Sequence, residues 1–157
     1  MAKGVSELES FLRERGVKYE IVDVGDAWSS RSAAAAVGVG LESVAKTVVF
    51  VGDGDAVLVV VPGDCRVDQR SLARMLGYRR LRLARREEVV EATGYEPGSV
   101  PPVGHAGRCR VVVDRRILGR GWVYAGGGSP RHLLRIRGAD IAALSGGEVL
   151  EVPCRGV

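Results

Sequence analysis

The sequence ESVAKTVVFVGDGDAVLVVVPG, residues 42–63, carries the clearest structural signal in the chain. Two apolar runs rich in valine flank the tetrapeptide GDGD, and Asp-Gly between such runs is typical of a tight hairpin turn. Runs that are apolar at nearly every position indicate strands covered on both faces. The stretch therefore predicts a β-hairpin in the core of a sheet.

The segments around this hairpin predict a mixture of helices and strands without a regular βαβ repeat. Helices are expected at 6–16, where Ser6 and Glu9 form a capping-box pattern, and at 29–40, 70–77 (capped by Asp68), 86–94 and 139–144. Strands are expected at 18–24, 81–83, 108–114, 121–127, 132–137 and 148–152. Because no interdomain linker or internal repeat interrupts this order, we expect residues 1–157 to form one mixed α/β domain.

The composition is ordinary for a globular protein, with a moderate basic excess: 46% hydrophobic residues, 27% charged residues and a net charge of +4. No apolar segment approaches the roughly 20 residues of a membrane helix. The first residues, MAKGVSELES, lack the apolar core of a secretion signal. We therefore expect a cytoplasmic protein without a membrane partner. Asparagine is absent and glutamine occurs only at Gln69, which fits a heat-adapted source.

The three cysteines, Cys65, Cys109 and Cys154, are odd in number and widely spaced. They form no CxxC pair and have no adjacent pair of histidines. This pattern predicts three small buried residues and neither a disulfide framework nor a metal site.

Lys46 is the most informative single residue, because it begins an apolar strand in a chain whose other lysines are only Lys3 and Lys18. A lysine at a strand end usually extends its ammonium to water along an apolar surface. Alternation instead places Lys46 on one face with Val48 and Phe50, opposite Thr47 and Val49. If that face lines a pocket, the compact ammonium would hold a carbonyl oxygen or a phosphate there.

Two glycine-rich loops are further candidates. GYEPGSVPPVGHAG, residues 94–107, can be neither helix nor strand, so it is either a connector or the wall of a binding site. In AGGGSPRH, residues 125–132, the glycines either form a hairpin turn or direct N–H groups toward an anion or carbonyl. His105 and His132, one in each loop, are open to either a structural or a functional role.

Several common hydrolase motifs are missing from the sequence. It contains no P-loop, no GxSxG elbow, no HExxH and no GxGxxG between a strand and a helix. Nucleotide hydrolysis, serine-esterase chemistry and zinc hydrolysis therefore lose support.

Three motifs together resemble the YbaK/ProX family of aminoacyl-tRNA deacylases: VAKTVVF at 44–50, GYEPGSVPPVGH at 94–105 and VYAGGGSPRHLLRI at 123–136. That family includes free-standing editing proteins and the editing domain inserted in bacterial prolyl-tRNA synthetases. The resemblance extends over nearly the whole chain and implies a single YbaK-like domain with a mixed, barrel-like β-sheet flanked by helices. It also implies hydrolysis of the ester that joins a wrong small amino acid to the 3′ end of a tRNA, expected to be proline-specific.

The resemblance assigns roles to residues of this chain as well. Lys46 would be the catalytic lysine that anchors the substrate near the scissile ester. The substrate-binding residues would be Gly94, Tyr95, Gly98, Val100 and Pro101 on one wall, and Gly126, Gly127, Gly128 and His132 on the opposite side. Some relatives carry an acidic residue shortly after the glycine turn, whereas this chain has none before Asp140. The edited amino acid is therefore left open.

The implied chemistry needs no nucleophilic side chain, cofactor or metal. An aminoacyl ester is already activated, so a positioned water and a stabilised oxyanion suffice, with the neighbouring ribose hydroxyl assisting proton transfer. Two rival hypotheses stay open: a non-catalytic binding protein for an amino acid, nucleotide or aminoacyl-tRNA, and an RNA-interaction module acting through arginines at 78–86 and 131–137. An aminoacyl-tRNA synthetase is a further partner compatible with the resemblance.

Overall fold

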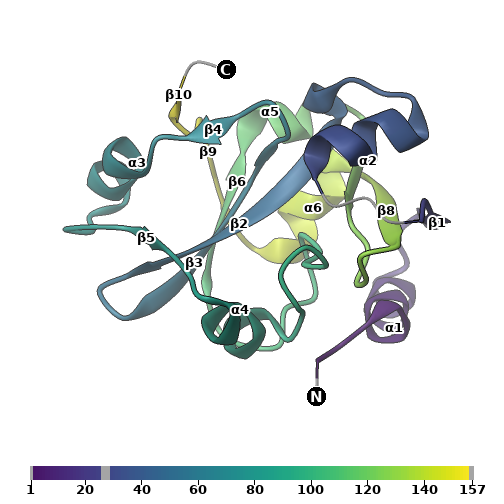
Figure 1. Cartoon of the computed structure of the whole chain (residues 1–157), viewed down its shortest axis with the longest axis horizontal. Helices are drawn as coiled ribbons and strands as arrows, with labels where there is room; N and C mark the ends of the chain where they lie inside the picture. The colour runs from purple at the N-terminus through teal and green to yellow at the C-terminus, as the bar shows by residue number, and fades with distance from the viewer. Residues whose placement is uncertain (1, 26–28, 156–157) are drawn as a thin grey trace.

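The hairpin predicted at residues 42–63 forms the centre of the sheet (Figure 1). Strand β2 (Val44–Gly52) pairs antiparallel with β3 (Asp55–Pro62), from Ala45 opposite Pro62 to Gly52 opposite Asp55. Both residues of the connecting turn have positive φ, +50° at Asp53 and +82° at Gly54. This is the backbone geometry for which an Asp-Gly turn is selected.

A computed structural model describes residues 2–25 and 29–155. Before the hairpin lie α1 (Val5–Arg15), β1 (Tyr19–Asp23), α2 (Ser30–Val37) and the short 3-10 helix η1 (Leu41–Ser43). After it follow β4 (Arg66–Val67), α3 (Gln69–Leu76), β5 (Arg82–Leu83), α4 (Arg86–Thr93), β6 (Arg110–Asp114), α5 (Arg115–Leu118), β7 (Trp122–Gly126), β8 (His132–Arg137), α6 (Gly138–Ser145), β9 (Glu148–Leu150) and β10 (Cys154–Arg155). None of the helices in this part of the chain is long and apolar enough to cross a membrane.

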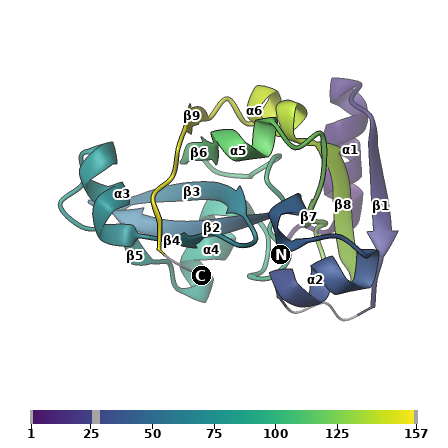
Figure 2. The ribbon, with the colours of Figure 1, turned by 90° about the horizontal axis from the view of Figure 1, so that it is seen from above.

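Eight strands form one mixed sheet in the order β1-β8-β7-β2-β3-β6-β9, with β5 also paired to β2. The pairs β2–β7, β3–β6 and β6–β9 are parallel, and the other pairs in this sheet are antiparallel. In Figure 2, β8 and β1 run across the direction of β2 and β3, so the sheet curls around its core. The prediction of one mixed α/β fold with a mixed sheet flanked by helices is confirmed.

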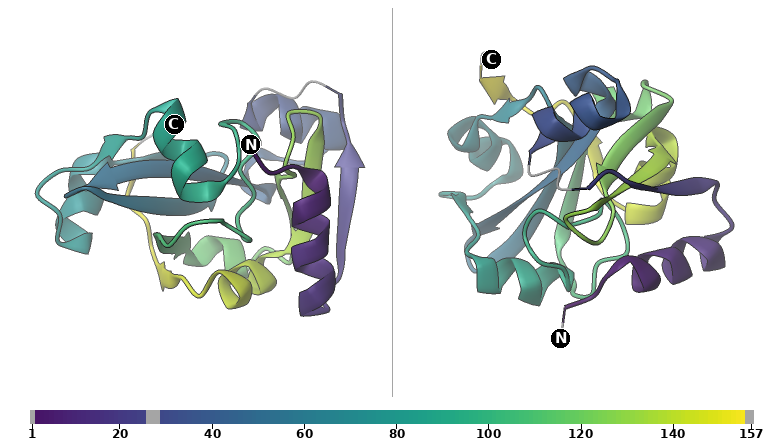
Figure 3. Two further views of the ribbon diagram at one scale, coloured as in Figure 1. Left: turned by 90° about the horizontal axis from the view of Figure 1, so that it is seen from below. Right: turned by 45° about the vertical axis from the view of Figure 1, so that its right-hand side comes forward.

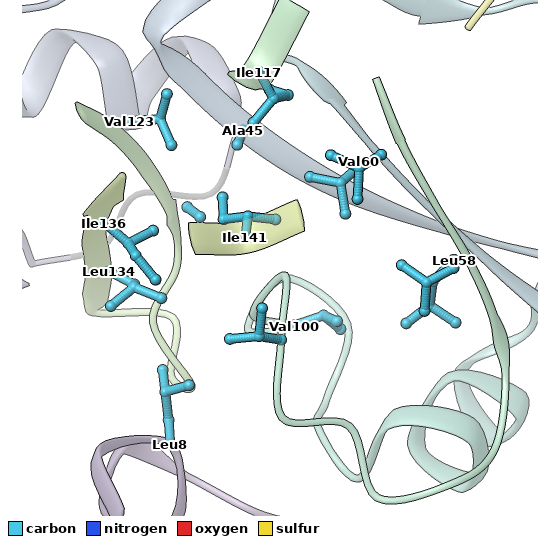
Figure 4. Close-up of a cluster of buried hydrophobic side chains, with 14 of the residues drawn as sticks. Leu8, Ala45, Leu58, Val60, Val100, Ile117, Val123, Leu134, Ile136 and Ile141 are labelled. Atoms are coloured by element: carbon cyan, nitrogen blue, oxygen red, sulfur yellow. The ribbon is translucent and has the colours of Figure 1, made fainter. Parts of the chain in front are cut away.

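The central strand β3 has core on both of its faces. Leu58 and Val60 belong to a cluster that also contains residues of α1, α5 and α6 (Figure 4). Val57, Val59 and Val61 belong to a second cluster with residues of α3. Burial on both faces explains why the strand is apolar at nearly every position.

Helix α1 begins earlier than its sequence pattern predicts. The capping box expected at Ser6 and Glu9 is wrong, because the helix is capped at Gly4, whose N–H donates to Glu7 Oε1 at 2.7 Å. Glu9 instead accepts a hydrogen bond from the Tyr19 hydroxyl at 3.1 Å. Two overlapping x-x-x-Glu patterns compete here, and the first of them forms the cap.

A disulfide joins Cys65, in the loop after β3, to Cys154 in β10. The Cα atoms lie 5.3 Å apart although the residues are 89 positions apart in sequence. Only Cys109 is free among the three cysteines, and it is half-buried. The prediction of three unpaired cysteines is wrong, because the antiparallel β4–β10 pair brings two distant segments together.

Candidate functional site

A pocket of about 160 Å³ lies beside the first residues of β2. Four segments that are far apart in the sequence meet there: the start of α2, the start of β2, the 94–107 loop, and the β7–β8 region. Its lining residues are Ser29, Ser30, Ala33, Val44, Ala45, Lys46, Thr47, Gly98, Val100, Ala125, Gly126 and Leu133. The structure therefore brings together four residues singled out from the sequence: Lys46, Gly98, Val100 and Gly126.

The start of β2 is held by backbone hydrogen bonds to the chain beyond β3. The Gly63 N–H donates to Val44 O at 2.7 Å and lies 3.1 Å from Leu41 O. Parallel pairing of Val44 with Tyr124 and of Ala45 with Ala125 fixes the other side of the strand. The backbone that carries Lys46 is thus fixed on both sides.

The Lys46 side chain is half-buried and lines two adjoining hollows. The second hollow, of about 220 Å³, is also lined by Arg31, Asp64 and Arg66. Burial lowers the pKa of Lys46 below its ordinary value; nearby Asp64 opposes this shift and Arg66 adds to it. No carboxylate of the described residues lies within 4.0 Å of the ammonium, which leaves it available to a bound group.

Thr47 is a pocket residue that reasoning from the sequence missed. Strand alternation placed it on the face opposite Lys46, yet both residues line the pocket. Its Oγ1 is buried and has no hydrogen-bond partner within the described chain. Buried polar groups are nearly always hydrogen-bonded, so this hydroxyl is a candidate to bind a polar atom of a ligand. No local sequence signal distinguishes it from a strand threonine packed in the core.

The 94–107 loop contributes only part of its length to the pocket. Gly94 ends α4 with φ +85°, and Tyr95 is 1% exposed within the core, where burial raises its pKa to about 12. Pro101 is buried, and its carbonyl oxygen lies 2.8 Å from His105 Nε2. None of these residues lines the pocket, although Gly98 and Val100, between them, do.

Burial lowers the pKa of His105 below its ordinary value, which favours the neutral ring. A neutral ring still donates one hydrogen bond, and the ring nitrogen facing Pro101 O is the one that donates. The sequence left a structural and a functional role open for His105, and the hydrogen bond to Pro101 O within the loop is a structural role.

The loop at residues 125–132 is hydrogen-bonded through its backbone to the 94–107 loop, and the two lie side by side in Figure 3. The Gly128 N–H donates to Ser99 O at 3.0 Å, and the Gly127 N–H donates to His132 O at 3.1 Å. A side chain at Gly126 would collide with Val100 O. Gly126 is therefore required for the close approach of the two loops, and of the three glycines it alone lines the pocket.

His132 lies at the start of β8, outside the pocket lining. Its Nδ1 lies 2.6 Å from Ser129 Oγ, and its Nε2 lies 3.8 Å from Asp23 Oδ2. These contacts orient the ring toward the end of β1 and the turn before β8.

The pocket suits a small, largely apolar group that carries a polar end. Its volume is close to the ~150 Å³ of a cavity known to hold benzene. Alanine, glycine, valine and leucine supply most of its wall, and Lys46 and Thr47 supply polar groups. None of the described lining residues is a carboxylate, a histidine or a cysteine. No cluster of three or more metal-ligating side chains occurs at residues 2–25 or 29–155.

Comparison with known proteins identifies relatives across most of the chain. Residues 25–144 match the family described as "Aminoacyl-tRNA editing domain". The chain is 31% identical over 124 residues to the uncharacterized protein YwhH of Bacillus subtilis, which covers 78% of both proteins. It is 35% identical over 101 residues to a proline–tRNA ligase of Nitratidesulfovibrio vulgaris, which covers 64% of the chain but only 18% of the ligase.

A crystal structure provisionally assigned as a trans-editing enzyme for prolyl-tRNA synthetase superposes with a TM-score of 0.87. The two chains are 35% identical, and the match covers 97% of each.

Proposed function

Because the chain belongs to the aminoacyl-tRNA editing domain family, we propose that it hydrolyses the ester of a mischarged tRNA, a proline-specific tRNA that carries a wrong small amino acid. The observation that carries this proposal is the convergence of Lys46, Thr47, Gly98, Val100 and Gly126 on one small pocket. We place the reaction in the cytoplasm, where charged tRNA is used.

In this proposal the aminoacyl group enters the pocket and its carbonyl oxygen faces the Lys46 ammonium. Water adds to the carbonyl carbon, the bond between that carbon and the ribose oxygen breaks, and the ribose oxygen takes up a proton. A fixed cation lowers the barrier, because negative charge grows on the carbonyl oxygen as water adds. The half-buried position of Lys46 strengthens this interaction relative to one in bulk water.

The size of the pocket supports a small amino acid. A volume of about 160 Å³ admits a short side chain with its ester carbonyl and leaves no room for a base as well. The terminal adenosine would then lie outside, toward the second hollow beside Arg31 and Arg66. The buried Thr47 hydroxyl would bind the free amino group or the carbonyl of the substrate.

Action in trans is part of the proposal. The match to the structure provisionally assigned as a trans-editing enzyme covers 97% of both chains. By contrast, the chain spans about a fifth of the length of the ligase relatives, 18% of the one from N. vulgaris. A synthetase would supply the mischarged tRNA, and the domain would act on it after release.

The test is hydrolysis of a proline-specific tRNA charged separately with proline, alanine, cysteine and serine. We expect rapid release of one noncognate amino acid and slow release of proline. If none of the four is released faster than without protein, the proposal of a proline-tRNA deacylase is wrong. Binding of the same charged tRNAs without hydrolysis would identify the protein as a binding module instead.

A further inference from the structure

A groove of about 1000 Å³ lies between α3 and the chain around β5 and shares no lining residue with the pocket. Five arginines line it without a carboxylate partner among the described residues: Arg70, Arg74, Arg79, Arg80 and Arg155. With Arg66, which lies beside Arg155, they are called here the arginine track. We propose that the arginine track binds the phosphate backbone of the acceptor stem of the tRNA whose aminoacyl group enters the pocket. This inference rests on the proposed function.

The track is connected to the pocket through the second hollow and the β4–β10 pair. Lys46 lines both the pocket and the second hollow, and Arg66 lines that second hollow. In the β4–β10 pair Arg66 lies directly opposite Arg155, which lines the groove. Residues directly opposite in an antiparallel pair have Cβ atoms about 5 Å apart. In Figures 1 and 2, β4 accordingly lies between α2, at the pocket, and α3.

No carboxylate in the part of the chain that the structure describes neutralises the charges of the track. All six side chains are exposed, and within the described chain none has a carboxylate within 4.0 Å. Neighbouring arginines do have such partners: Arg82 pairs with Glu88 at 2.8 Å. The single acid that lines the groove, Asp68, caps α3 through the Ser71 N–H. Arginines left unpaired beside one another indicate an external polyanion.

The spacing suits a nucleic-acid backbone. Arg70 and Arg74 are four residues apart in α3 and so project from one face of the helix. Like charges at this spacing disfavour a helix, so the pair has no stabilising role of its own. Arg79 and Arg80 line the same groove from the chain that precedes β5, and the eight residues of α3 are about 12 Å long. Guanidinium groups bind phosphates in a bidentate manner, which favours arginine over lysine along such a groove.

The first experiment measures binding of uncharged tRNA, which requires no hydrolysis. The test variant replaces Arg70, Arg74 and Arg80 with glutamine. Its control replaces Arg13 and Arg15 of α1, and Lys18 just before β1, with glutamine; α1 lies at the opposite end of the molecule from α3 (Figure 2). Both variants lose three positive charges. We expect the test variant to bind on the order of tenfold more weakly at about 0.1 M salt. The slope of the logarithm of the binding constant against the logarithm of the salt concentration should fall in magnitude by about two to three.

Wild-type affinity and slope in the test variant would overturn the proposal. An equal loss in both variants would also overturn it, because the effect would then reflect net charge and not the track.

A second experiment separates this inference from the proposed function. Hydrolysis of the mischarged tRNA is compared with hydrolysis of a short substrate, the same amino acid esterified to a CCA trinucleotide. We expect the test variant to lose about tenfold in kcat/KM on the tRNA and to match wild type on the trinucleotide. Equal loss on both substrates would overturn the track as an acceptor-stem site. If wild type hydrolyses neither substrate but tRNA binding still depends on the three arginines, the proposed reaction fails while the track stands.

Discussion

At the scale of single residues, the Lys46 ammonium is half-buried and its pKa is lowered below the ordinary value, first by burial. If the charged form holds the ester carbonyl, hydrolysis declines as the pH rises through this lowered pKa. The decline therefore begins at a lower pH than the titration of a free lysine. It is measured as the enzyme-catalysed rate after subtraction of spontaneous hydrolysis at each pH.

Lys46→Arg is the matched control for this pH dependence, because arginine stays charged across the whole range. We expect a reduced rate in this variant, since the geometry changes, but no alkaline decline. An alkaline decline of equal size in both proteins would show that another group titrates.

Thr47 gives a second prediction, because its hydroxyl is buried without a partner. Thr47→Val keeps the shape of the side chain and removes only the hydroxyl. Since an unsatisfied buried polar group costs about 1–3 kcal/mol, we expect the free energy of unfolding to stay level or rise. Hydrolysis should fall by about tenfold if the hydroxyl binds the substrate, as one lost hydrogen bond is worth about 1 kcal/mol or more. Full activity in a stable Thr47→Val protein would remove Thr47 from the proposed site.

A candidate site residue could be found from the sequence where its residue type is rare in the rest of the chain. Lys46 stands out because arginine serves as the basic residue nearly everywhere else. Tyr95 and Gly94 lie in the same motif as Gly98 and Val100, yet they belong to the core and to the end of α4. A motif read along the sequence does not separate residues that face a pocket from those that support its wall. That separation depends on how the two loops pack.

At the scale of secondary-structure elements, the disulfide ties the C-terminal segment to the loop after β3. Closing a loop of 89 residues restricts the unfolded chain, so Cys154→Ser should lower the free energy of unfolding by about 4 kcal/mol. The measurement is denaturant unfolding without reductant. Cys109→Ser is the control, since that cysteine is free, and it should change stability by less than about 1 kcal/mol.

Thiol titration of the unreduced, denatured protein checks the same bond directly. One free thiol per chain is expected, because Cys109 alone is unpaired among the three cysteines. Three free thiols together with equal stability in the two serine variants would contradict the disulfide.

Elements with a strong local pattern were predicted well, whereas three of the shortest elements were missed. The hairpin and α3 with its Asp68 cap follow from valine runs, turn residues and a capping side chain. The elements α5, β4 and β10 are two to four residues long, too short for a periodic pattern. They depend on tertiary partners: Asp114 begins α5 by accepting from the Arg116 N–H at 2.8 Å, and it also accepts from the Val152 N–H at 2.9 Å.

At the scale of the whole molecule, the curled sheet brings α2, β2, β7 and β8 to one pocket, while α3 and α1 lie at opposite ends (Figure 2). The sequence predicts the mixed sheet and its flanking helices, but the pocket needs the parallel β2–β7 pair, which joins segments about 80 residues apart. The disulfide and the near-absence of amide side chains both fit the heat-adapted source that the composition predicts, because proteins of hyperthermophiles are rich in disulfides.

The most direct test of the account is the single-turnover rate of ester hydrolysis on the mischarged tRNA, with enzyme in excess, for wild type, Lys46→Ala and the control Lys18→Ala. Lys18 is exposed just before β1 and does not line the pocket. We predict a loss of about a hundredfold or more for Lys46→Ala, with the free energy of unfolding changed by less than about 1 kcal/mol, and wild-type values for Lys18→Ala. A Lys46→Ala protein that is equally stable and hydrolyses the ester at the wild-type rate would contradict the account.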